Sequence, residues 1–296
     1  MLSFLPGFLM IPFSFTLYSL NLAFCGMIIL FGGILKLLLP FSACHRVNYT
    51  VMHAVYRLWA IINFSIMRLT NPLQWEVEGD DKLDLKSWYL IIANHQSWID
   101  ILVISQFALF KIPAPKFFLK EELRWVPFIG TACWALDMPF MKRYSRQYLE
   151  KNPHLKGKDI ETTKKSCEKF KDHPTSIINF VEGTRFTAEK HQKTGSKFRH
   201  LLAPKAGGIA FTLAAMGEQF DKVLNITILY PDNQGRVMFD LLSGNLKRIH
   251  IQVEQVEVTT DVIGDYFNDD SFKNRFQVWL NEKWQQKDKL IAQMLG

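Results

Sequence analysis

Two polar side chains that could form a catalytic pair, His95 and Asp100, lie in the stretch of residues 94–100. The apolar run at residues 88–93 is typical of a buried strand, so the pair lies where a strand ends and a turn begins. Five positions along one regular helix would turn the two side chains about 140° apart. If His95 lies in the turn, Ser97 caps a new helix and Asp100 occupies its first turn, the carboxylate can fold back onto the imidazole. This arrangement would make a base with an orienting partner.

A second polar cluster, Glu182-Gly183-Thr184-Arg185, follows the apolar run at residues 176–181, which also predicts a strand. Gly183 lets the backbone approach a ligand closely, and Thr184 offers a hydroxyl group and an amide. The guanidinium of Arg185 matches a phosphate group, and Glu182 could hold this arginine in place. The cluster therefore predicts a phosphate-binding turn at a strand end.

Further basic residues could complete such a phosphate site. Lys142 and Arg143 end a strand predicted at residues 138–143 and form a candidate ligand pair. The loop at residues 185–205 carries six Lys or Arg side chains against a single acidic one, Glu189. This run of charge favours a solvated surface that faces lipid headgroups.

Other catalytic signatures are missing from the sequence. No Gly-x-Ser-x-Gly elbow surrounds Ser97, and no Gly-rich phosphate loop occurs, so covalent catalysis by a serine is not indicated. The other histidines and the four scattered cysteines lack ligand spacing, which argues against a metal centre and a disulfide framework. The formal net charge of +7 favours an anionic partner such as a membrane surface or a phosphorylated substrate. Nucleic acid is disfavoured because no recognised binding motif for it is present.

The elements that must position these clusters begin with a hydrophobic stretch. Residues 2–35 carry no charged side chain and exceed the roughly 20 apolar residues that cross a bilayer. Lys36 and His45-Arg46 follow it, so the positive-inside tendency predicts that the domain after it faces the cytosol. Proline and glycine residues within the stretch leave open a bent or re-entrant hairpin in place of one straight span. Residues 48–69 have a helical spacing that fits either a helix in the headgroup layer or a plain core helix.

Strands and helices alternate with short links after residue 70, which predicts an α/β domain with a mixed sheet covered by helices. We therefore assign residues 1–70 to a membrane helix or helical hairpin with an interfacial helix, and residues 71–296 to a catalytic domain. Residues 271–295 predict an amphipathic closing helix whose aromatic stripe packs against the domain. The remaining predicted strands are residues 75–79, 116–120, 224–230 and 249–258, the last a strand or hairpin, and the predicted helices are residues 101–110, 121–136, 159–171 and 206–216.

The two polar clusters, in this order and separation, resemble blocks I and III of the glycerolipid acyltransferase family, whose best-known member is 1-acylglycerol-3-phosphate acyltransferase. The resemblance covers residues 75–296, with a looser match in the hydrophobic N-terminus. Features most similar to the branch of lysocardiolipin acyltransferase and its bacterial relatives are residues 116–130, residues 140–143, Tyr230-Pro231 and a Trp-Leu-x-x-x-Trp-x-x-Lys-Asp-like ending. The sequence departs from the family pattern at two places, and both bear on which lysophospholipid is the acceptor. Lys142 stands where many members have an acidic or amide residue, and residues 226–231 replace the usual block IV.

The resemblance implies acyl transfer from a thioester, acyl-CoA or acyl-carrier protein, to the free hydroxyl of a lysophospholipid at the bacterial inner membrane. It implies that His95 is the general base and that Asp100 fixes its tautomer. It also implies that Arg185, with Arg143 and Lys142, holds the acceptor phosphate, and that no metal or tightly held cofactor takes part. The alternative from another class is a non-enzymatic membrane lipid-binding module with the same fold. A lipid hydrolase would lack its nucleophile.

Overall fold

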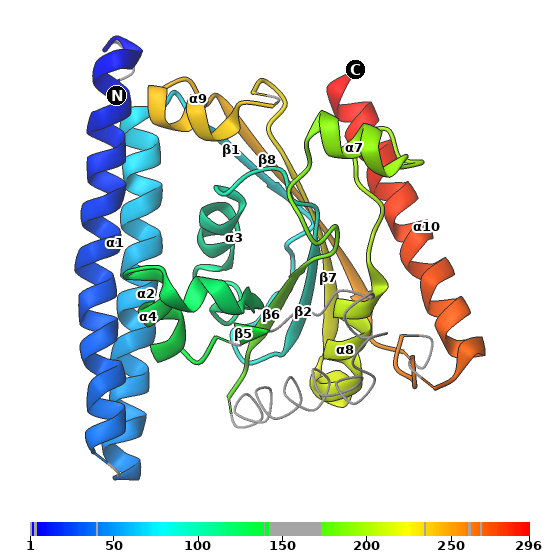
Figure 1. Cartoon of the computed structure of the whole chain (residues 1–296), viewed down its shortest axis with the longest axis horizontal. Helices are drawn as coiled ribbons and strands as arrows, with labels where there is room; N and C mark the ends of the chain where they lie inside the picture. Colours follow the sequence, from blue (N-terminus) through cyan, green and yellow to red (C-terminus); the bar gives the residue numbers. More distant parts are fainter. Residues whose placement is uncertain are drawn as a thin grey trace.

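A mixed six-stranded sheet forms the centre of the fold, with the strand order β1-β8-β7-β2-β6-β3 (Figure 1). Strands β7 and β8 are antiparallel, whereas the other neighbouring pairs are parallel. The predicted α/β class with a mixed sheet is therefore confirmed. The strands are β1 (Gln74–Glu78), β2 (Tyr89–Ala93), β3 (Pro115–Phe117), β6 (Ser176–Phe180), β7 (Lys222–Leu229) and β8 (Arg248–Glu257). The computed structural model describes residues 2, 5–39, 41–138, 140–141, 173–233, 235–259, 262–266 and 268–296.

Strand β2 lies between two apolar cores because its side chains alternate between the two faces of the sheet. Leu90 and Ile92 join one core, and Ile91 and Ala93 join the other. All of β2 is buried, as a continuous apolar run covered by helices on both faces requires. The turn that follows this strand is therefore anchored on a rigid support.

Helices cover both faces of the sheet, and α10 lies on the side opposite the N-terminal helices (Figure 1). Helices α2, α3, α4 and α9 contribute to one core, and α8 and α10 contribute to the other. The closing helix α10 buries Phe272, Phe276 and Trp284, which confirms the predicted packing of its aromatic stripe. The bounds are α3 (Asp100–Ala108), α4 (Ile129–Ala135), α7 (Ala188–Thr194), α8 (Ala206–Met216), α9 (Val237–Ser243) and α10 (Asp270–Leu295), with 3-10 turns η1 (Glu121–Trp125) and η4 (Gly217–Gln219).

The N-terminal region is a hairpin of two long helices, α1 (Gly7–Leu38) and α2 (Ser42–Thr70), which lie side by side (Figure 1). Helix α1 is continuous through Pro12, so the structure does not contain the bent alternative left open for this stretch. Within the described part of the chain, α1 is the one helix long and apolar enough to cross a bilayer. Helix α2 places Met52 and Tyr56 in the core beneath the sheet, which favours the core-helix alternative for this segment.

Several element boundaries differ from the prediction. Residues 116–120 are divided between β3 and a second short strand, β4 (Leu119–Lys120), which pairs with β5 (Phe140–Met141) outside the main sheet. Residues 121–136 are not one helix but are divided between η1 and α4, and Pro127, which cannot continue a helix, lies between them. Strand β8 is one continuous strand and not a hairpin. The predicted helix at residues 159–171 and the end of the predicted strand at residues 138–143 lie outside the described residues.

Two adjacent glycines bring α1 close to its neighbours. A Cβ atom on Gly32 would lie 2.7 Å from the side chain of Met52, and one on Gly33 would lie 2.8 Å from the Cβ atom of Ala135 in α4. The side chain of Asn48 donates a hydrogen bond to the carbonyl oxygen of Gly32 at 2.6 Å. Close contact at these glycines therefore joins the apolar helix both to α2 and to the helices that cover the sheet.

Replacing Gly33 by alanine should destabilise the protein by roughly 1–3 kcal/mol, because the added methyl group would overlap α4. Gly26→Ala is the matched control, since its Cβ atom would meet Phe128 only at an ordinary contact distance of 3.4 Å. The control should be neutral or slightly stabilising, as alanine is the better helix former. Thermal unfolding of both variants in the same detergent measures the difference. Equal melting temperatures would contradict the close contact at Gly33.

Candidate active site

The side chains of His95 and Asp100 are in direct contact at the end of β2. The Nδ1 atom of His95 lies 2.8 Å from Oδ2 of Asp100. The carboxylate is fully buried, while the imidazole is 14% exposed. Because a carboxylate can only accept, Nδ1 carries the ring proton and Nε2 is left as the proton acceptor. The structure thus brings together the two residues that the sequence placed in one turn.

The local geometry of this turn differs from the prediction at Ser97. Helix α3 begins at Asp100, and its N-terminus has no capping side chain. Oδ2 of Asp100 instead accepts the backbone N–H groups of Gln96 at 2.7 Å and Ser97 at 2.9 Å. The carboxylate that orients His95 therefore also shapes the turn. These two amides, which could have served an oxyanion, are already bound to Asp100.

Tyr230 is a third member of the site that sequence reasoning did not assign. Its hydroxyl group donates to Oδ1 of Asp100 at 2.5 Å, and the side chain is buried immediately after β7. Burial raises the pKa of Tyr230 well above its ordinary value, so the hydroxyl group remains a donor. The sequence feature that could have identified Tyr230 was the Tyr230-Pro231 pair in residues 226–231, the segment that replaces the usual block IV. Strand β7 neighbours β2, which is why this distant residue reaches Asp100.

The backbone at the end of β2 is fastened on both sides. The side-chain amide of Asn94 donates to the carbonyl oxygen of Ile228 and accepts from its N–H group, both at 2.9 Å. The carbonyl oxygen of His95 accepts the N–H group of Phe186 at 2.7 Å. The ring of Phe180 stacks on the imidazole with centroids 4.1 Å apart. These contacts therefore fix both the backbone and the ring of His95 in position.

Glu182 binds a different partner from the one expected. Its Oε1 atom accepts the N–H group of His95 at 3.0 Å, and its Oε2 atom accepts that of Leu202 at 3.1 Å. The prediction that Glu182 holds Arg185 is wrong, because the carboxylate is buried and its two oxygens bind these backbone groups. Burial raises the pKa of Glu182 to about 7, against the opposing effect of the two hydrogen bonds. Glu182 therefore positions the backbone of His95.

The remaining residues of the turn form a basic site. Gly183 has a φ of +70°, and a side chain there would press against Lys205. The guanidinium of Arg185 lies 4.7 Å from the centre of the Trp98 ring, which draws it towards the turn of His95. Thr184 accepts a hydrogen bond from Lys190.

Two lysines near this turn were not singled out by the sequence. Nζ of Lys190 is 2.8 Å from the Thr184 hydroxyl group and 3.0 Å from the carbonyl oxygen of Arg185. Lys205 lies against Gly183. The interpretation of residues 185–205 as a solvated surface does not hold at Lys190, which is half-buried by these contacts, whereas Lys205 is exposed as that interpretation expects. The other two predicted phosphate ligands, Lys142 and Arg143, lie outside the described residues.

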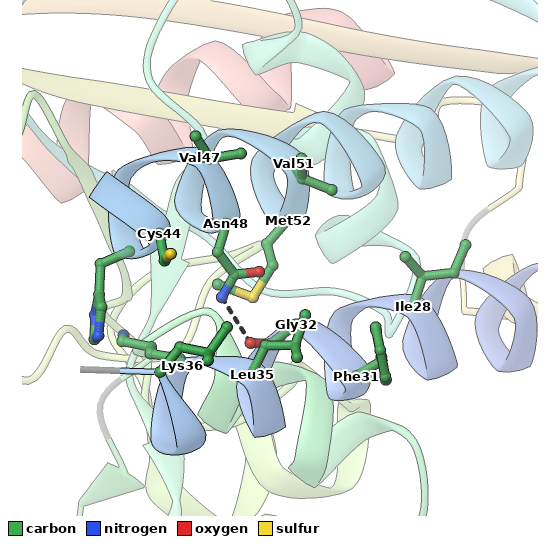
Figure 2. A pocket seen from close by; sticks show the side chains of 12 residues that line it. Ile28, Phe31, Gly32, Leu35, Lys36, Cys44, Val47, Asn48, Val51 and Met52 are labelled. Carbon is green, nitrogen blue, oxygen red and sulfur yellow. Dashed lines mark hydrogen bonds between the residues drawn. The ribbon is translucent and has the colours of Figure 1, made fainter. Parts of the chain in front are cut away.

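A separate groove of about 460 Å³ lies between the ends of α1 and α2 that meet at the hairpin turn (Figure 2). Apolar side chains form most of its lining, and Figure 2 shows the hydrogen bond from Asn48 to Gly32 at its base. Lys36 at the rim is paired with Asp137. The groove contains none of the predicted site residues, so it belongs to the hairpin and not to the site around His95.

The profile of the Acyltransferase family matches residues 74–229, which is more than half of the chain, so this protein belongs to the Acyltransferase family. The matched region contains β1 to β7 and both polar clusters.

Individual relatives agree with this assignment. The chain is 22% identical over 284 residues to lysocardiolipin acyltransferase 1 of Gallus gallus, covering 91% of this chain and 69% of that protein. It is 25% identical over 213 residues to 1-acyl-sn-glycerol-3-phosphate acyltransferase delta of Homo sapiens, covering 67% of this chain and about half (51%) of that protein. The crystal structure of the 1-acyl-sn-glycerophosphate (LPA) acyltransferase PlsC from Thermotoga maritima has the same fold, with a TM-score of 0.54 at 18% identity over 94% of this chain and 95% of that one.

Removal of the Tyr230 hydroxyl group should lower the rate of acyl transfer. Tyr230→Phe deletes a hydrogen bond to a buried carboxylate, a loss of about 1.5–3 kcal/mol, so kcat should fall about tenfold or more while KM changes little. Tyr89→Phe is the matched control, because its buried ring also loses one hydrogen bond, at the opposite end of β2. The two variants are compared in steady-state assays. An equal loss of kcat in both would contradict a role of Tyr230 in orienting Asp100.

Proposed function

We propose that this protein transfers a fatty acyl group from a thioester donor, acyl-CoA or acyl-carrier protein, to the free hydroxyl group of a lysophospholipid. The acceptor we propose is 1-acylglycerol-3-phosphate, which would give phosphatidic acid, or a related lysophospholipid. The observation that carries the proposal is the double attachment of His95. Asp100 holds its ring, while Glu182, the first residue of the basic turn, holds its backbone.

His95 is the proposed general base. Its Nε2 atom takes the proton of the acceptor hydroxyl group as the oxygen attacks the thioester carbonyl carbon. The new C–O bond forms, the C–S bond breaks, and the imidazolium returns the proton to the leaving thiolate. Asp100 stabilises the imidazolium during this exchange, so no covalent enzyme intermediate is needed.

The acceptor phosphate is proposed to bind at the basic turn. Arg185 provides a planar guanidinium, Thr184 provides a hydroxyl group, and Gly183 leaves room for a close approach. Lys190 and Lys205 add positive charge to the same turn. Lys142 and Arg143 are proposed as further phosphate ligands on the basis of the family resemblance. Binding of the non-reacting phosphate here would place the glycerol hydroxyl group beside His95.

The hairpin is proposed to hold the enzyme in the membrane that contains its acceptor. Helix α1 exposes large apolar side chains along its whole length, among them Phe8, Phe15, Phe24, Phe31 and Leu38. A surface of this kind is unfavourable in water and suits contact with lipid tails. The basic residues that follow α1 in the sequence favour the cytosolic side for the catalytic residues, and we propose the bacterial inner membrane as the location.

Product analysis tests the proposed reaction directly. Purified full-length protein is given a panel of lysophospholipids with acyl-CoA or acyl-carrier protein, and the lipids are identified by mass spectrometry. A diacyl product that depends on both substrates supports the proposal. Binding of lipid without any new product would support the lipid-binding module, and a free fatty acid formed with water as the only acceptor would indicate a hydrolase.

His95→Ala should lower kcat by a factor of about 10²–10⁴, because it removes the general base. Membrane insertion should remain close to wild type, and thermal stability should fall only moderately, because Asp100 keeps three of its four hydrogen-bond donors. His45→Ala, in the hairpin and outside the site, is the control and should retain activity. Substantial turnover by the His95 variant would reject the base assignment.

Arg185→Ala should act mainly on acceptor binding. The loss of a charge-assisted contact to a group that does not react should raise KM for a phosphate-bearing acceptor about tenfold or more, with a smaller change in kcat. Arg236→Ala, which removes an arginine stacked on Phe239 at the start of α9, is the matched control. KM is measured for the acceptor at saturating donor. An unchanged KM in the Arg185 variant would count against the phosphate site.

A further inference from the structure

Three polar side chains of the closing helix α10 point into the protein, although the helix lies on the face of the sheet opposite α3 (Figure 1). They are Trp284, Lys287 and Asp288, part of the Trp-Leu-x-x-x-Trp-x-x-Lys-Asp-like ending of the sequence. Trp284 and Lys287 are buried, at 0% and 2% exposure. A buried lysine is costly unless its charge is compensated, so its presence in a packing helix requires an explanation.

Trp284 and Asp288 hold one short segment, residues 199–202. The indole N–H group of Trp284 donates to the carbonyl oxygen of Leu202 at 2.9 Å. The two carboxylate oxygens of Asp288 accept the N–H groups of Arg199 and His200, each at 2.8 Å. The segment is therefore fixed to α10 at both ends.

This segment is connected to the catalytic histidine through one residue. The N–H group of Leu202 donates to Oε2 of Glu182, whose Oε1 atom accepts the N–H group of His95. A continuous series of hydrogen bonds thus runs from Trp284 through Leu202 and Glu182 to His95. The three hydrogen bonds in this series join residues that are 82, 20 and 87 positions apart in the sequence.

Lys287 is a buried basic group on this side of the sheet, and burial lowers its pKa to about 7 against the opposing effect of Glu182 and Glu254. Its Nζ atom donates to the carbonyl oxygen of Ile226 in β7 at 2.6 Å and lies 4.6 Å from the Trp284 ring centre. The acidic groups that face it are Glu182 and Glu254, and Glu254 is already bound by Lys283 and Asn225. The charged groups that face Glu182 are Lys287 and Asp100, and these act in opposite directions on its charge.

We propose that α10 is a positioning element of the active site, in which Trp284 and Asp288 hold residues 199–202, this segment holds Glu182 and through it the backbone of His95, and Lys287 fastens the helix to β7. Glu182 needs both oxygens as acceptors to join Leu202 to His95. A protonated Glu182 has one O–H group in place of an acceptor and can hold only one of the two backbone groups well. The inference rests on the proposed acyl transfer, because its effect is on the rate of that reaction.

The direction of the pH effect follows from the charges. Burial raises the pKa of Glu182 to about 7, and Lys287 opposes this increase. Without Lys287 the pKa of Glu182 rises further, so the carboxyl group stays protonated to a higher pH. Protonation of the base His95 also contributes to the acid limb of the kcat profile. A shift of this limb to higher pH in Lys287→Met is therefore assigned to Glu182 only where Glu182→Gln abolishes it. Packing by Lys287 alone would leave the position of that limb unchanged.

The experiment compares full-length wild type, Lys287→Met and Leu280→Ala, assayed for kcat against pH with a lysophospholipid and donor that the product analysis identifies. Leu280 is a buried residue of the same helix and the same core, without a polar contact to the segment. We expect Leu280→Ala to lower the melting temperature and to leave the acid limb in place. In a Glu182→Gln background, Lys287→Met should produce no further shift, because no carboxyl group remains to titrate there.

Hydrogen exchange provides a readout that does not need activity. Trp284→Phe keeps an aromatic ring but loses the bond to Leu202, so backbone amides of residues 196–205 should exchange faster, as they should in Lys287→Met. Exchange of these amides at the wild-type rate in Trp284→Phe would overturn the inference. Absence of transfer by the wild type with every substrate would reject the proposed function instead, and unchanged exchange in both variants would then also reject the connection through α10.

Discussion

The buried carboxylate of Asp100 is the constraint on which the site depends. A fully buried negative charge is stable only when several donors surround it, and here four groups do so. Three of them come from the turn after β2, and the fourth, Tyr230, comes from the neighbouring strand. The requirement explains why β2 and β7 must be adjacent and why the chain turns sharply between His95 and α3. The hydrogen bonds that stabilise the buried carboxylate also set the orientation of the imidazole.

A second buried carboxylate, Glu182, acts on the backbone of the same residue. The two carboxylates therefore divide the control of His95, one holding Nδ1 of the ring and the other the N–H group. Their environments differ. Asp100 receives four donors, whereas Glu182 receives two backbone amides and the more distant charge of Lys287. Glu182 is consequently the less fully satisfied of the two carboxylates, and burial raises its pKa to about 7.

Much of this architecture could be predicted from the sequence, and the failures have physical reasons. The run before His95 identified β2, and the spacing to Asp100 identified the pair, because both depend on residues close together in the chain. Tyr230 and Lys190 were not assigned, since their contacts follow from strand order and from the direction in which a loop folds. Glu182 was assigned to Arg185 because sequence proximity suggests an ion pair, whereas burial placed it on backbone amides. The domain boundary proposed near residue 70 remains a prediction.

The position of α10 has a consequence for how the protein is made. The hairpin and the His95 turn are synthesised before α10, but the backbone of His95 is held through Glu182 and Leu202 by this later helix. Contacts of such large sequence separation form late in folding, and N-terminal parts fold first during synthesis. Under the proposed function, the hairpin reaches the membrane before His95 is correctly placed. The growing chain is then attached while still inactive, and its activity begins only after α10 packs.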